Sequence, residues 1–207
     1  MTLTAARRNG LTLYAEAADL AGHAVRLVLA EKSLGVDIHY VTPETCPEDL
    51  FALNPYHQIL TLFDRELVLY DAPVMLEYLD ERYPHPPLMP TDPMSRANNR
   101  QLRGRIAREL LDVAGSCRGE TADARRARRV VSDNLHAIAP IFALRKFFMS
   151  DEFSLADCCL APLLWRLPSY GVTLTSEAKP LLRYADALFA RPAFRHSLSP
   201  AERALRA

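Results

Sequence analysis

One stretch of the sequence, residues 59–90 (ILTLFDRELVLYDAPVMLEYLDERYPHPPLMP), restricts the fold of this chain more than any other part. It predicts, in order, a strand, a tight turn, a second strand and a helix, at 60–63, Asp64-Arg65, 66–70 and 72–83. Asp71 is a good N-cap for that helix, and Pro73 is tolerated in its first turn. Prolines then end the helix. A strand pair followed directly by a capped helix indicates part of a mixed α/β unit.

The residues before this stretch complete the same mixed pattern. They predict a strand, a helix, a strand and a short helix, over 11–14, 20–32, 36–41 and 47–53. The short helix ends at Asn54-Pro55, because a residue before proline disfavours the helical conformation. The resulting order, β-α-β-α-β-β-α, is the thioredoxin-like layout. We therefore predict a thioredoxin-like α/β domain over residues 1–85.

The remainder of the chain is predicted to be helical. Five prolines lie between residues 84 and 93, and they indicate a rigid linker over 86–95. No strand pattern follows, and apolar residues recur at helical spacing. Ser154 and Asp157 have the spacing of a capping box, and the helix after them is apolar on nearly all sides, which predicts a buried central helix. A helix over 179–190 and a polar tail then complete an all-α domain over 96–207.

Composition excludes several classes of protein. The chain has 207 residues, 49% of them hydrophobic, and a formal net charge of zero, so the whole molecule is not a general polyanion binder. No apolar run of membrane-spanning length and no signal peptide are visible, so a soluble cytoplasmic protein without membrane association is expected. The four cysteines lack metal-ligand spacing and are expected to be reduced; a redox role for Cys46 is a minor alternative.

Four runs of residues carry a resemblance to a known family. They are HAVRLVLAEK (23–32), EYLDERYPHPPLMP (77–90), SDEFSLADC (150–158) and LAPLLWRLP (160–168). The chain resembles the glutathione-transferase superfamily over nearly its whole length, and within it the stringent starvation protein A family. The second and fourth runs are the more specific ones. The resemblance implies a glutathione-transferase-like fold, with a thioredoxin-like N-terminal domain and an all-α C-terminal domain.

The resemblance also shows which residues of a glutathione site are replaced. Where transferases have a cis-proline in a Val-Pro-Thr-Leu run, this chain has Leu60, and a cis bond before a non-proline residue costs about 2.5–4 kcal/mol. Where they have Glu-Ser, it has Asp71-Ala72, without a hydroxyl. Their catalytic Ser or Cys falls at Asp19, whose carboxylate opposes thiolate formation. We therefore expect no catalytic residue, no cofactor and no metal.

The resemblance implies a function in transcription instead. Members of the family are regulators that lack transferase activity, form homodimers, bind RNA polymerase holoenzyme with a σ70-type factor, and alter promoter use under starvation or stress. The family's partner-binding element corresponds here to Pro84, His85 and Pro86, with Tyr83 and Pro87 beside them. RNA polymerase, a second copy of the chain and a co-regulator protein are the expected partners.

The chemistry of proline independently supports a binding role for this segment. Proline locks φ and removes a backbone donor, so prolines on both sides of His85 present it on a stiff segment that loses little entropy on binding. The plainer alternative is an interdomain linker with a solvated histidine. Sequence alone favours that alternative, and the family resemblance reverses the preference.

A second feature is basic. Between Arg96 and Arg129 there are ten arginines and four acidic residues. Three interpretations compete: solvated helix faces with local ion pairs, an acidic protein partner, and direct DNA binding. DNA binding is the weakest of these, because no recognition motif accompanies the charge, and sequence-specific nucleic-acid binding is not expected.

Two other functions remain open at this stage. One is a glutathione-dependent transferase that uses Tyr14, which lies at the end of the first predicted strand, although a tyrosine there is more often a packing residue. The other is a module that docks partners in a different complex, with the same fold and no polymerase.

Overall fold

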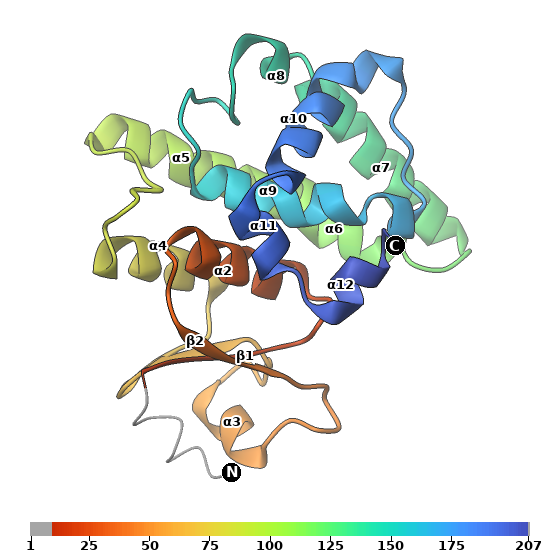
Figure 1. Cartoon of the computed structure of the whole chain (residues 1–207). Coiled ribbons are helices and arrows are strands. Elements are labelled where there is room, and N and C mark those ends of the chain that lie inside the picture. The colour runs from red at the N-terminus through yellow and green to blue at the C-terminus, as the bar shows by residue number, and fades with distance from the viewer. Residues whose placement is uncertain (1–9, 207) are drawn as a thin grey trace. The chain divides into compact units, whose positions relative to one another are not determined.

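The computed structural model describes residues 10–206, and the chain divides into two compact units (Figure 1). The first unit comprises Met1–Pro86 together with His196–Ala207, and the second comprises Pro87–Arg195. In the first unit the elements up to residue 86 are β1 (Leu11–Ala15), α2 (Leu20–Glu31), β2 (Val36–Tyr40), α3 (Glu48–Leu53), β3 (Thr61–Asp64), β4 (Leu67–Leu69) and α4 (Ala72–Arg82).

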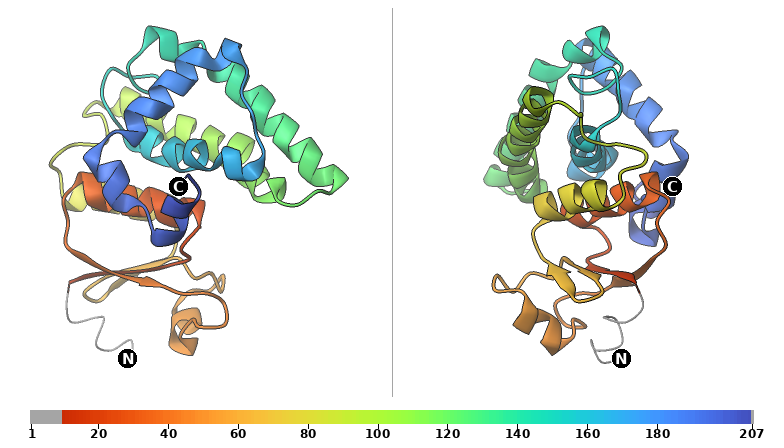
Figure 2. Two further views of the ribbon diagram at one scale, coloured as in Figure 1. Left: turned by 45° about the vertical axis from the view of Figure 1, so that its right-hand side comes forward. Right: turned by 90° about the vertical axis from the view of Figure 1, so that its left-hand side faces the viewer.

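The four strands form one sheet in the order β2-β1-β3-β4. Strand β1 pairs with β2 in parallel and with β3 antiparallel, so that Leu13 lies opposite both Ile38 and Leu62. Strand β4 returns antiparallel to β3. Helices α2 and α4 cover one face of the sheet and α3 the other (Figures 1 and 2). This arrangement confirms the predicted thioredoxin-like layout.

Burial explains why these segments form these elements. All five residues of β1 are buried, and so is the inner part of α2, which therefore packs against the sheet and α4. Apolar burial of this kind contributes about 25 cal/mol per Å². The hairpin turn differs by one residue from the prediction: it lies at Arg65-Glu66, and Arg65 has a positive φ of 57°.

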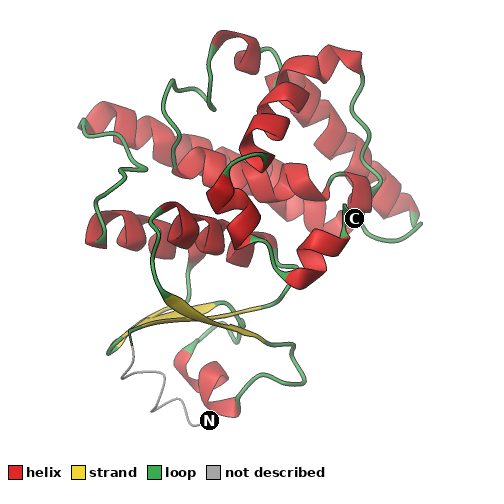
Figure 3. Ribbon diagram, viewed as in Figure 1, coloured by secondary structure: helices red, strands yellow, loops and turns green. Residues whose placement is uncertain are grey.

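The second unit is helical, as the colouring of Figure 3 shows. Its helices are α5 (Pro93–Ile106), a π-helical segment (Ala107–Leu111), α6 (Asp112–Ala114), α7 (Ala122–Ile138), α8 (Ile141–Leu144), α9 (Leu155–Arg166) and α10 (Lys179–Phe189). Short 3-10 turns lie at Gly115–Cys117, Pro168–Tyr170 and Ser176–Ala178. Helix α5 begins at Pro93, inside the segment 86–95 predicted as a linker.

Helix α9 is the buried centre of this unit, as predicted from its apolar sequence. Ser154 and Asp157 form the predicted capping box at its N-terminus. Asp157 is fully buried, and its carboxylate also accepts hydrogen bonds from the Phe148 amide at 2.9 Å and the Tyr184 hydroxyl at 2.6 Å. One carboxylate therefore joins the start of α9 to the preceding loop and to α10.

The C-terminal segment differs most from the prediction. The predicted helical domain extended over 96–207 and ended in a polar tail. Instead, the chain forms α11 (Pro192–Ser197) and α12 (Pro200–Ala204), and residues from His196 onward belong to the first unit. Ser197, Ser199 and Glu202 are buried there. Their polar partners, described below, lie on α2 and in the loop before it, which no local pattern in the sequence indicates.

Three further features bear on function. In the part of the chain that the structure describes, no helix is long and apolar enough to cross a membrane. Among the same residues, no cluster of three or more histidine, cysteine or acidic side chains is arranged to hold a metal ion. All four cysteines are free thiols.

Candidate functional site

The five predicted partner-binding residues form one continuous surface segment directly after α4. We call residues 83–87 the proline ridge. Pro84, His85, Pro86 and Pro87 are exposed, and Tyr83 is half-buried. The guanidinium of Arg82 lies over the Tyr83 ring, 5.3 Å from its centroid, which favours a fixed ring position. The peptide bond between His85 and Pro86 is cis.

The proline ridge is connected to the interior of the first unit by a buried lysine. Lys32, at the C-terminal end of α2, is 5% exposed. Its ammonium group donates to the Asp80 carboxylate at 2.5 Å and to the Pro86 carbonyl at 2.7 Å. Sequence reasoning missed this pair, although Lys32 and Asp80 lie within two of the runs that carry the family resemblance.

The counterpart of a glutathione site is a cleft within the first unit. We call it the acidic cleft: a cavity of 580 Å³ whose described lining residues are Glu16, Asp19, Ala21, Tyr56, Gln58, Ile59, Leu60, Tyr70, Asp71, Ala72 and Pro73. Three of these side chains are acidic and none is basic. Two like charges about 4 Å apart repel by about 1–4 kcal/mol near a protein surface. Such a lining disfavours a ligand with carboxylates, and glutathione has two.

The carboxylate of Asp19 caps the helix that it precedes. It accepts hydrogen bonds from the backbone amides of Ala21 at 3.3 Å and Gly22 at 2.6 Å. These are N–H groups that lack a partner within the helix, so the role of Asp19 is that of an N-cap. A carboxylate engaged in this way does not donate a hydrogen bond to a thiol.

Asp71 has the same role at the next helix. Its carboxylate accepts a hydrogen bond from the Val74 amide at 3.1 Å, as the sequence predicted. Ala72 follows it without a hydroxyl group. The positive end of the α4 dipole therefore already faces the negative charge of the Asp71 carboxylate. This helix end offers no hydroxyl to an incoming carboxylate, and the charge of Asp71 opposes such a ligand.

Leu60 lines the acidic cleft just before β3. Among residues 10–206, the only cis peptide bond is the one before Pro86, so the bond between Ile59 and Leu60 is trans. The cis bond that transferases have at this position is therefore absent, in accord with its cost before a non-proline residue.

Tyr14 lies away from the acidic cleft, in the core of the first unit. It is 6% exposed and stacks on His39 with ring centroids 4.8 Å apart, and it meets Phe63 edge-on. Burial, followed by the negative charge of Asp37, raises the pKa of its hydroxyl above the usual value. Tyr14 is thus a packing residue. Its position in the core and its raised pKa both make it unsuited to activate a thiol.

The cysteines have no feature of reactive thiols. Burial raises the pKa of Cys46, which leaves it protonated at neutral pH. Cys159 is affected more strongly, and burial raises its pKa to about 11. The alternative of a redox role for Cys46 therefore gains no support.

Many arginines of the basic stretch are engaged within their own unit. Arg105 pairs with Glu109 through two hydrogen bonds of 3.1 Å, and Arg128 donates to the Cys117 carbonyl at 3.0 Å and to the Gly119 carbonyl. Arg103 is buried and donates to Asn99. Much of the positive charge therefore has a local structural role, in accord with the plainest of the three interpretations.

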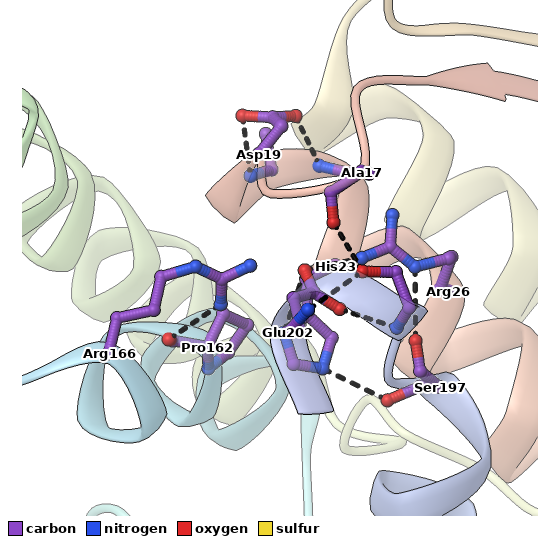
Figure 4. Close-up of polar contacts among 11 residues, drawn as sticks. Ala17, Asp19, His23, Arg26, Pro162, Arg166, Ser197 and Glu202 are labelled. Carbon is purple, nitrogen blue, oxygen red and sulfur yellow. Dashed lines mark hydrogen bonds and ion pairs between the residues drawn. The ribbon is translucent and has the colours of Figure 1, made fainter. Parts of the chain in front are cut away.

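A buried polar cluster fastens the C-terminal segment to α2, and Figure 4 shows its members directed at one another. The Arg26 guanidinium donates to Glu202 Oε1 at 2.6 Å and to the Ser197 carbonyl at 3.0 Å. His23 contacts the Ser197 hydroxyl at 3.0 Å, and the Ser199 hydroxyl donates to the Ala17 carbonyl at 2.5 Å. This cluster holds the loop between β1 and α2, which borders the acidic cleft.

Comparison with known proteins gives matches over both units. The glutathione S-transferase N-terminal domain family matches residues 21–82, and the glutathione S-transferase C-terminal domain family matches residues 82–192. A theta class glutathione S-transferase from Xanthomonas axonopodis pv. citri, solved with glutathione bound, has a TM-score of 0.83 and 17% identity, covering 91% of this chain and 97% of that one. At that identity the likeness shows the fold alone.

Two relatives found by sequence have a much higher identity to this chain than the solved structure has. The stringent starvation protein A homolog of Coxiella burnetii is 43% identical over 202 residues, which cover 97% of each chain. The homolog of Pasteurella multocida is 42% identical over 200 residues, covering 96% of this chain and 94% of its own. Both alignments extend over nearly the whole length of the chain.

Proposed function

Because the chain belongs to the stringent starvation protein A family, within the glutathione S-transferase-like proteins, we propose that it is a non-enzymatic regulator of transcription. It binds RNA polymerase holoenzyme with a σ70-type factor, acts as a homodimer, and alters promoter use under starvation or stress. The observation that carries the proposal is family membership combined with the exposed proline ridge.

The proline ridge is suited to protein recognition. His85 stands between prolines that fix the backbone on both sides, and a segment ordered in advance loses little conformational entropy on docking. The imidazole can donate and accept hydrogen bonds, while the proline rings offer rigid apolar surface. In the proposed mechanism the two ridges of a homodimer dock on the holoenzyme and change how the σ factor meets promoter DNA or activators.

The acidic cleft supports the non-enzymatic half of the proposal. Its carboxylates at Asp19 and Asp71 cap helices, Ala72 lacks a hydroxyl, and Leu60 replaces a proline. The differences at positions 19, 60 and 72 each remove a group that the glutathione site of this fold uses. Because they occur together, we expect neither glutathione binding nor transferase activity.

The proposal is tested by recovery of polymerase from the native cell extract. Wild-type protein is compared with the triple variant Pro84→Ala/His85→Ala/Pro86→Ala. A matched control, Pro55→Ala/His57→Ala, removes an exposed proline and histidine from another loop of the same unit. We expect core polymerase and σ with wild type and the control, and loss of both with the triple variant, at unchanged melting temperature.

Two other outcomes of this test would change the proposal. Recovery of polymerase with the triple variant would move the interface away from the proline ridge. Absence of polymerase from the wild-type sample would contradict the proposed function and leave a partner-docking module of another complex.

A further inference from the structure

Lys32 is an unusual lysine because its ammonium group lies inside the protein. Its side chain has no exposed surface, and its nitrogen lies between the Asp80 carboxylate and the Pro86 carbonyl, at 2.5 and 2.7 Å. A buried ammonium is stable only with a counter-charge and with hydrogen-bond acceptors. Asp80, itself 7% exposed, supplies the counter-charge from α4. The Pro86 carbonyl is a second acceptor, and it belongs to the proline ridge.

The prolines fix φ along the proline ridge, but they leave it few backbone donors that could hold the whole segment in place against its surroundings. Pro84, Pro86 and Pro87 have no backbone N–H, so His85 is the only residue from 84 to 87 that could donate one. The segment follows α4. At the C-terminal end of that helix the Tyr83 amide donates a hydrogen bond to the Leu79 carbonyl. Beyond that point the helix ladder no longer orients the chain. An external donor to a ridge carbonyl is therefore well placed to orient it.

We infer that Lys32 is the positioning residue of the proline ridge: by donating to the Pro86 carbonyl it fixes the backbone that presents His85 to the partner. Asp80 holds the ammonium group in place by its charge. This inference rests on the proposed function for its partner. The placement of His85 by Lys32 is a property of the isolated protein and is measurable without polymerase.

Substitutions distinguish the charge of Asp80 from the hydrogen bond that Lys32 donates to Pro86. Asp80→Asn removes the charge and keeps the donor to Pro86, whereas Lys32→Met removes both contacts and leaves the Asp80 carboxylate buried without its cation. Lys32→Met/Asp80→Leu replaces the whole pair with apolar side chains, and such replacements of buried pairs are often neutral or stabilising. We therefore expect this double variant to keep the fold while it removes the donor to Pro86, and its melting temperature checks this. Lys179→Met, at an exposed lysine, is the control for loss of a lysine.

The first readout is the mobility of His85. Its backbone amide is the only ¹⁵N–H probe between residues 84 and 87, and relaxation gives its order parameter on the ps–ns timescale. We expect about 0.85 in wild type and Lys179→Met, and less than about 0.6 in Lys32→Met/Asp80→Leu at wild-type melting temperature. An unchanged order parameter and unchanged His85 ring signals in the folded double variant would overturn the inference.

The second readout is affinity for purified holoenzyme. If the ridge holds its binding conformation only about a tenth of the time without Lys32, the apparent Kd rises about ten-fold. The triple alanine variant should bind far more weakly still. Wild-type affinity in a double variant whose ridge has become mobile would overturn the link to recognition. Failure of wild type itself to bind would contradict the proposed function, while the order parameter would still decide whether Lys32 positions the ridge.

Discussion

At the scale of single residues, the acidic cleft shows how a side chain can change its role without disturbing the fold. Asp19 and Asp71 satisfy backbone amides at the starts of α2 and α4. An N-cap contributes about 1 kcal/mol, so both residues have a structural reason to be present. The same carboxylates make the cleft unfavourable for an anionic ligand. At position 19, where transferases have Ser or Cys, the aspartate thus caps a helix and also adds a negative charge to the acidic cleft.

Tyr78 allows a pH-dependent prediction at this scale. Its hydroxyl donates to the Asp64 carboxylate at 2.6 Å, and burial together with this acceptor raises the pKa of Tyr78 to about 12, from a usual value of 10.0. The fold therefore favours the protonated form. This contribution to the free energy of unfolding is complete below pH 10 and is lost as the pH rises from 10 to about 12.

We expect wild type to exceed Tyr78→Phe in free energy of unfolding by about 1 kcal/mol near pH 8, because Tyr78 is only partly buried. Urea unfolding of both proteins at about pH 8 and about pH 11.5 measures the difference at each pH, which cancels the other groups that titrate in this range. The difference should shrink at the higher pH. A difference that stays constant would show that folding does not raise the pKa of Tyr78.

At the scale of elements, helix α12 is held by an ion pair rather than by an apolar face. Glu202 is fully buried, and one of its carboxylate oxygens accepts a hydrogen bond from the Arg26 guanidinium at 2.6 Å. The other carboxylate oxygen accepts a hydrogen bond from the Ser199 amide in a capping box. The short helix and its attachment to α2 therefore depend on the same side chain. Loss of Arg26 would leave the buried Glu202 carboxylate without its guanidinium partner, with the His23 ring 3.5 Å away as a basic neighbour.

Arg26→Met should lower the free energy of unfolding by about 3–5 kcal/mol, the usual cost of removing one partner of a buried pair. Arg129→Met, at an exposed arginine of α7, is the matched control and should change it by no more than about 0.5 kcal/mol. Urea unfolding at neutral pH measures both. Equal stability of the two variants would mean that the C-terminal segment is not held through Arg26.

At the scale of the whole molecule, the chain has the fold of the glutathione S-transferases, and its acidic cleft differs from their glutathione site at positions 19, 60, 71 and 72. Wild type should show no rise in melting temperature with glutathione at about 10 mM, whereas a ligand at 100 times its Kd would stabilise the protein by about 2.7 kcal/mol. The absence of a rise would follow from the lost groups together, rather than from any one of them.

A restored variant is the sharpest control for this prediction. It combines Asp19→Ser, Leu60→Pro, Asp71→Glu and Ala72→Ser, and it should gain a measurable thermal shift with glutathione where wild type has none. A shift in wild type would contradict the non-enzymatic proposal and return attention to the acidic cleft.

Local signals in the sequence predicted most of the fold. Asp71 and Ser154 were recognised as caps because capping depends on residues within one helical turn, and both caps are present. The alternation of strands and helices up to residue 83 was predicted from periodicity together with caps and prolines, with differences of one residue at the ends, such as the hairpin turn. The proline ridge was identified from the family resemblance, because proline content by itself indicated only a rigid linker, and its binding role remains a prediction.

The sequence by itself therefore determined the layout of the elements, the helix caps and the position of the proline ridge, because each depends on neighbours along the chain. Only the tertiary structure decided that Lys32 reaches Pro86, 54 residues away, and that Arg26 reaches Glu202, 176 residues away. It also decided that Tyr14 is buried in the core. Periodicity shows which face of an element is apolar, but a contact between polar side chains depends on how distant elements pack.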